Sequence, residues 1–154
     1  NASFYSGAKN KTIYQTNLSL MTTMNFQCEE LTISDEELGC TIIFSDSKSA
    51  DDQFKTIDEI MNSEEKYLLI QKTYPEDDFE HSYYHIESSE SDTALDFEDK
   101  MIVRLNRDKF EISWSGDQLK IGLDLTNREL IDLKEILEVV FKERVIMKHK
   151  ISYF

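Results

Sequence analysis

The stretch that decides the fold spans residues 102–124 and reads IVRLNRDKFEISWSGDQLKIGLD. Apolar and polar side chains alternate along it, as in the series Phe110, Ile112 and Trp114. This period of two is typical of strands that place one face on a core and the other in water. Turn-forming residues at 106–109 and 115–117 separate the apolar runs. We therefore predict a meander of three antiparallel strands.

The residues after this meander carry the start signal of a helix. Thr126 and Glu129 have the spacing of a capping box, and Leu125 and Leu130 have the spacing of a hydrophobic staple. Apolar residues then recur at helical spacing to about Phe141. This pattern predicts a helix that lays one apolar stripe on the sheet.

The first half of the chain alternates between strand and helix patterns. Strands are expected over residues 26–33, 38–44, 66–74 and 81–87, the first two flanking an acidic turn at 34–37. Between them, a helix is expected to begin at Ser49 and to end near residues 62–63. Its buried face would carry Phe54, Ile57, Ile60 and Met61.

These elements, with a closing strand or ordered tail over residues 145–154, predict a single α+β domain over residues 21–154. We expect one mostly antiparallel sheet of about six to eight strands, with two helices packed on its core face. Residues 1–20 are expected to be a tag remnant followed by a polar leader.

The composition narrows the class of partner. The chain has 154 residues with 31 acidic and 17 basic side chains, a net charge of −14, and 40% of its residues are hydrophobic. That hydrophobic content can build a core, and no apolar run reaches the roughly 18–20 residues of a membrane span. The negative charge would repel a phosphate backbone. We therefore expect a cytoplasmic protein that binds neither nucleic acid nor membrane.

The negative charge is concentrated in one block. Residues 73–99 contain ten acidic residues and no Lys or Arg. Such a run is most often a solvated surface, but aromatic residues share this block, and aromatic anchors beside carboxylates suit a partner rich in Lys and Arg. The predicted partner-binding residues are Glu76, Asp77, Asp78, Glu80, Tyr83, Glu87, Glu90, Asp92, Asp96, Glu98 and Asp99.

Catalytic and cofactor motifs are not visible in the sequence. His81 and His85 lie four residues apart, but on a strand this spacing puts them about 13 Å apart, too far to share a metal. No EF-hand loop, nucleophile elbow or phosphate-binding loop is present. We expect neither an enzyme nor a metal or cofactor site. Cys28 and Cys40 are expected to be half-buried thiols, with pairing across a hairpin left open.

Several segments resemble the bacterial immunity protein 10 family. They are EEKYLLIQK at 64–72, YYHIE at 83–87, DKMIVRLNRDKF at 99–110 and the capped helix at 130–141. The resemblance implies a small cytoplasmic protein that binds and blocks a cognate toxin domain of polymorphic or contact-dependent growth-inhibition systems. Such toxins are often nucleases with basic surfaces. The alternative is a domain that senses a small ligand or a metal in a pocket between sheet and helix.

Overall fold

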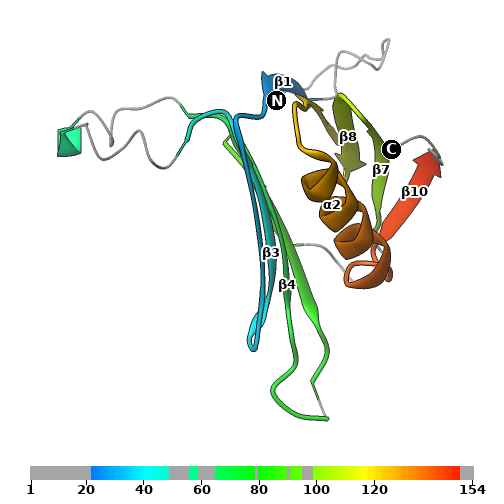
Figure 1. Cartoon of the computed structure of the whole chain (residues 1–154). Coiled ribbons are helices and arrows are strands. Elements are labelled where there is room, and N and C mark those ends of the chain that lie inside the picture. The colour runs from blue at the N-terminus through cyan, green and yellow to red at the C-terminus, as the bar shows by residue number, and fades with distance from the viewer. Residues whose placement is uncertain are drawn as a thin grey trace, which may run out of the picture.

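The computed structural model describes residues 22–48, 56–58, 65–78, 80–89, 91–94 and 99–149. Within these ranges ten strands form two five-stranded sheets, and one complete helix accompanies them. The α+β class is therefore confirmed. The expectation of one sheet with six to eight strands and two helices is not, since the described strands divide between two sheets (Figure 1).

The mixed sheet has the order β1-β9-β8-β7-β10. Its centre is the predicted meander of β7 (Met101–Asn106), β8 (Lys109–Trp114) and β9 (Asp117–Gly122). Positive φ angles of 42° at Ser115 and 87° at Gly116 make the tight turn between β8 and β9. At the edges, β1 (Thr22–Gln27) runs parallel to β9 and β10 (Val145–His149) runs parallel to β7.

The antiparallel sheet follows chain order, with each strand paired to the next. Its strands are β2 (Glu30–Glu36), β3 (Gly39–Ser45), β4 (Tyr67–Thr73), β5 (Tyr83–Ser88) and β6 (Ser91–Ala94). Alternate residues of β3, β4 and β5 are buried on one face, while the residues between them are half-buried or exposed. One face of this sheet therefore packs on the core, and no described element packs on the other, which we call the uncovered face.

The helix α2 (Asn127–Val139) begins where the capping box predicts. The backbone N–H of Glu129 donates to the Thr126 hydroxyl at 3.1 Å, and the backbone N–H of Thr126 donates to the Glu129 carboxylate at 2.9 Å. Its buried side chains are Leu130, Leu133 and Leu137. Figure 1 shows α2 lying beside the antiparallel sheet and over the mixed sheet.

Both sheets and α2 contribute to a single hydrophobic core. The rings of Phe44 on β3 and Phe110 on β8 stack with their centroids 4.5 Å apart, and both side chains are fully buried. Nearer the end of α2, the rings of Tyr84 on β5 and Phe141 lie 6.3 Å apart. These aromatic contacts join the antiparallel sheet to the mixed sheet and to the helix end.

The strand expected over residues 26–33 is wrong as a single element. The chain leaves the mixed sheet and enters the antiparallel sheet at Cys28 and Glu29, where the backbone N–H of Cys28 donates to Gly122 at 2.8 Å and that of Glu29 donates to Ser45 at 2.7 Å. The alternation changes phase at this point, because apolar residues at 26 and 28 are followed by Glu29 and Glu30 and then by apolar residues at 31 and 33. This shift marks a break in the strand, but it does not show that the pairing partner changes.

Most of the helix expected from Ser49 lies outside the described residues. Within residues 56–58, Ile57 and Asp58 are helical, but the Ile57 side chain is 75% exposed rather than packed on the core. The expected positions Phe54, Ile60 and Met61 are not described, nor are residues 1–21 and 150–154. In the described part of the chain, no helix is long and apolar enough to cross a bilayer.

Candidate partner-binding site

Two turns of the antiparallel sheet lie side by side at one end of it. Gly39 at the start of β3 pairs with Thr73 at the end of β4, and the backbone N–H of Tyr74 donates to the Leu38 carbonyl at 3.0 Å. In Figure 1 this end of the sheet extends beyond α2. We call its seven carboxylates the acidic tip: Asp35, Glu36, Glu37, Glu76, Asp77, Asp78 and Glu80.

All seven residues of the acidic tip are exposed. The Tyr74 hydroxyl donates to Asp35 at 2.5 Å and so links the two turns. Burial and this hydrogen bond raise the pKa of Tyr74, which keeps the hydroxyl protonated as a donor. Within the longer loop, the backbone N–H of Glu76 donates to the Glu80 carboxylate at 3.1 Å. Asp35 and Glu36 are thus at the end of β2, Glu37 is in the turn that follows, and the other four carboxylates are in the loop between β4 and β5.

The nearest cation in sequence, Lys72, bonds to the end of α2, and its ammonium lies 5.8 Å from the ring centre of Tyr74. Lys72 on β4 donates to the Val140 carbonyl at 3.0 Å and lies 3.5 Å from the Glu143 carboxylate, with its side chain only 14% exposed. Its ammonium also lies 5.6 Å from the ring centre of Tyr84. A cation here complements the negative end of the helix dipole. Lys72 therefore stabilises the end of α2.

The uncovered face of the antiparallel sheet starts at the acidic tip and carries a polar network. The Tyr67 hydroxyl donates to the Glu87 carboxylate, and the His85 ring nitrogen lies 3.3 Å from the other oxygen of Glu87. The bond from Tyr67, followed by that from His85, holds the pKa of Glu87 below its usual value of 4.5. Glu87 is therefore anchored to the sheet face.

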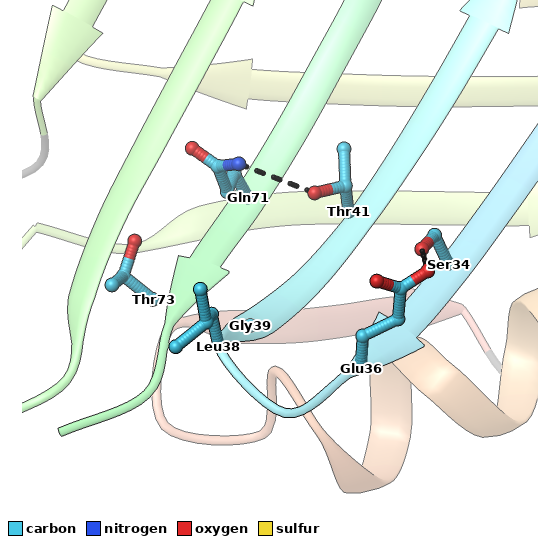
Figure 2. Close-up of a pocket in the computed structure, with 7 residues that line it drawn as sticks. All are labelled: Ser34, Glu36, Leu38, Gly39, Thr41, Gln71 and Thr73. Carbon is cyan, nitrogen blue, oxygen red and sulfur yellow. Dashed lines mark hydrogen bonds between the residues drawn. The ribbon is translucent and has the colours of Figure 1, made fainter. Parts of the chain in front are cut away.

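A hollow of about 270 Å³ lies on the same face, next to the acidic tip (Figure 2). Its floor includes Gly39, where an added Cβ would come within 2.5 Å of the Lys72 carbonyl oxygen, so only glycine fits without a backbone shift. The lining residues are Ser34, Glu36, Leu38, Gly39, Thr41, Gln71 and Thr73. The hollow differs from the predicted pocket between sheet and helix, because it opens on the side of the sheet away from the core.

The predicted partner-binding residues occupy different parts of the structure. Glu76, Asp77, Asp78 and Glu80 are in the acidic tip, and Tyr83 beside them is 66% exposed. The remaining predicted residues are spread out: Glu87 is half-buried on the sheet face, Asp92 pairs with it in register on β6, Asp99 is half-buried before β7, and Glu90, Asp96 and Glu98 lie outside the described residues.

Sequence reasoning missed the contribution of Asp35, Glu36 and Glu37 to this site. The acidic turn was visible in the sequence at residues 34–37. What was not visible was its position beside the loop that follows Thr73, which depends on the register between β3 and β4. The acidic turn at residues 34–37, between two predicted strands, was the signal that could have suggested it.

The two cysteines are far apart and free. Cys40 pairs with Asp35 in the strand register, whereas the residue after Cys28 bonds to Ser45 at the other end of β3. Cys28 is 4% exposed and Cys40 is 0% exposed, so the expectation of half-buried thiols is wrong. Burial raises the pKa of both thiols to about 11. Among the described residues, no group of three or more His, Cys, Asp or Glu could hold a metal ion.

No protein-family model matches the chain, and no curated protein matches it. The resemblance to immunity proteins therefore rests on its sequence motifs alone.

Proposed function

We propose that this chain is a binding protein that neutralises a basic protein partner through the acidic tip. In keeping with the immunity-protein resemblance, the partner is a bacterial toxin domain met in the cytoplasm, and a nuclease is the class that suits it best. The observation that carries the proposal is the convergence of seven carboxylates from two turns at one projecting end of the antiparallel sheet, with Lys72 turned toward α2.

The negative charge of the acidic tip would speed the association of the chain with a basic partner. A nuclease that binds phosphates presents Lys and Arg on its substrate surface. Carboxylates that project from a sheet end attract such a surface before contact, and this steering raises association rates toward ~10⁸ M⁻¹s⁻¹ at low salt. The tip therefore acts mainly on the association rate and on its salt dependence.

The neighbouring aromatic residue supplies the short-range part of the interaction. Tyr83 is 66% exposed at the start of β5, next to the loop that carries Glu76 to Glu80. A large exposed aromatic side chain is costly to leave in water and is frequently an energetic hot spot when a partner covers it. Tyr83 is expected to slow dissociation, whereas the carboxylates speed association.

The test compares two variants that differ only in where charge is removed. The tip variant combines Glu76→Gln, Asp77→Asn, Asp78→Asn and Glu80→Gln. The control variant combines Asp108→Asn, Asp124→Asn, Glu135→Gln and Glu138→Gln, four exposed residues of the mixed-sheet turns and α2. Both remove four negative charges. The partner tested is the toxin domain encoded beside the gene for this chain.

We expect the tip variant to associate about tenfold or more slowly at low salt and to lose most of its salt dependence. The control variant should stay within about threefold of the unmodified chain. Equal slowing in both variants would show that only net charge matters. Unchanged association in the tip variant would place the interface elsewhere.

A further inference from the structure

The hollow beside the acidic tip is bordered by hydrogen-bond acceptors from neighbouring strands (Figure 2). The Ser34 hydroxyl donates to one oxygen of the Glu36 carboxylate at 3.1 Å. The Gln71 amide nitrogen donates to the Thr41 hydroxyl at 3.2 Å, and Figure 2 shows the Gln71 amide oxygen pointing away from that bond. Among the described residues, no hydrogen bond is formed by the second Glu36 oxygen, which can accept from a ligand.

The shape of the hollow limits what enters it. Its volume of about 270 Å³ is below the ~300–1,000 Å³ of pockets for drug-sized molecules. Glu36, Gly39 and Thr73 lie opposite one another on three neighbouring strands. Because Gly39 has no side chain, space is left between the side chains of Glu36 and Thr73. Leu38, which is 72% exposed, adds an apolar surface at the edge. A single long side chain fits such a space better than a metabolite does.

The charge around the hollow selects the type of side chain. None of its lining residues is Lys or Arg, and Glu36 belongs both to the lining and to the acidic tip. Arginine carries five N–H donors on a planar group that is always charged, and it has an apolar stem. The donors match the Glu36 carboxylate, while the stem matches Leu38.

We propose that the hollow receives one arginine side chain of the basic partner, with its guanidinium donating to the Glu36 carboxylate and its apolar stem lying along Leu38. This inference rests on the proposed function for the origin of the arginine, and it adds a specific anchor to a tip that otherwise acts at long range. Anchors of this kind, an arginine inserted in a pocket, are frequent hot spots of protein interfaces.

The test uses small probes and the full chain. Amide ¹H–¹⁵N spectra are recorded during titration with Nα-acetyl-arginine methylamide, and separately with the citrulline analogue, which has nearly the same shape without the charge. We expect saturable shifts confined to amides around the hollow, including Ser34, Gly39 and Gln71. The citrulline analogue should bind about tenfold more weakly.

Two pairs of variants distinguish specific binding of arginine in the hollow from general attraction of arginine to the charge of the acidic tip. Glu36→Gln should weaken arginine binding about tenfold, whereas Glu37→Gln, which removes the same charge from the neighbouring turn position, should change it by less than about twofold. Thr73→Trp fills the hollow from an exposed strand position without changing charge and should abolish the confined shifts. Thr73→Ser at the same position should retain them.

Absence of saturation, equal binding of both probes, or equal effects of Glu36→Gln and Glu37→Gln would overturn the subsite. Because the probes carry no partner surface, a failed titration leaves tip-dependent association with the toxin domain unaffected. Conversely, confined arginine binding together with association that ignores the tip variant would overturn the proposed function while leaving the hollow a guanidinium site.

Discussion

The two sheets share one core, but they differ in how they balance charge. Around the mixed sheet, carboxylates have cationic neighbours: Lys109 lies 3.6 Å from Glu111, and on α2 Lys134 lies 2.8 Å from Glu138. At the end of the antiparallel sheet, seven carboxylates gather while Lys72 faces α2. The described ion pairs around the mixed sheet join opposite charges, whereas the acidic tip gathers like charges at a projecting end, where we propose that a basic partner binds.

The connections of the two sheets explain this difference. The mixed sheet closes its edges with β1 and β10, which come from opposite ends of the described chain. The antiparallel sheet is built of hairpins in chain order, so its turns lie at its two ends. Turns at a free end carry few packing demands and can hold residues chosen for binding.

The largest expected effect breaks the contact that joins the two sheets. Phe110→Ala removes a fully buried ring that stacks on Phe44, and it should lower the free energy of unfolding by about 3–5 kcal/mol. Denaturant unfolding followed by circular dichroism measures this loss. Ile102→Ala on the neighbouring strand, where the side chain is 36% exposed, serves as the control and should cost much less. A Phe110→Ala loss no larger than the control would mean that the sheets do not depend on this contact.

A smaller effect is expected at the helix start. Thr126→Ala removes the capping hydroxyl that accepts from Glu129 and should lower the free energy of unfolding by about 1 kcal/mol. Thermal unfolding measures the change, and Thr126→Ser should retain most of the stability. If serine and alanine were equivalent at this position, the capping box would contribute nothing.

The pH dependence of stability should identify Glu87 as an anchored carboxylate. Because its pKa is lowered in the folded state, its contribution is present above about pH 4.5 and is lost as the pH falls through its folded pKa. Unfolding measured from pH 7 to pH 3 should therefore show a steeper loss for the unmodified chain than for Glu87→Gln. Parallel pH profiles for the two proteins would contradict the network with Tyr67.

The smallest effect on stability is expected where the effect on binding is largest. The tip variant should change the free energy of unfolding by no more than about 0.5 kcal/mol, since its four residues are exposed and occupy a loop. Relief of repulsion between like charges favours a slight gain. Denaturant unfolding of the tip variant measures this. A large decrease in the free energy of unfolding would mean that the loop carboxylates support the fold. It would contradict the interpretation that they serve binding and not stability.

The parts of the fold that were predictable from sequence are those specified by local contacts. The capping box of Thr126 and Glu129 and the alternation around Phe110 each involve neighbouring residues, and both elements form where expected. At Cys28 the shift of the apolar alternation signals a break in the strand, but the change of sheet was not predictable because it depends on distant partners. The number of sheets was missed for the same reason.

Some residues of the candidate site were also predictable from sequence, whereas others depend on contacts between distant segments. Glu76, Asp77, Asp78 and Glu80 were predictable, because a run of like charge is visible in any sequence. The partnership of Glu36 with that run depends on the pairing of Gly39 with Thr73, which places two distant turns together. Glu87 was included by its charge, but its bonds with Tyr67 and His85 give it a structural role on the sheet face.

The binding of a basic partner at the acidic tip is tested most directly by a hydrogen-exchange footprint of the chain with and without the proposed toxin partner. We expect new protection in the two turns of the acidic tip and along the neighbouring face of the antiparallel sheet, with exchange in α2 and the mixed sheet unchanged. Protection centred on α2 or β10, with the tip exchanging as freely as before, would contradict it.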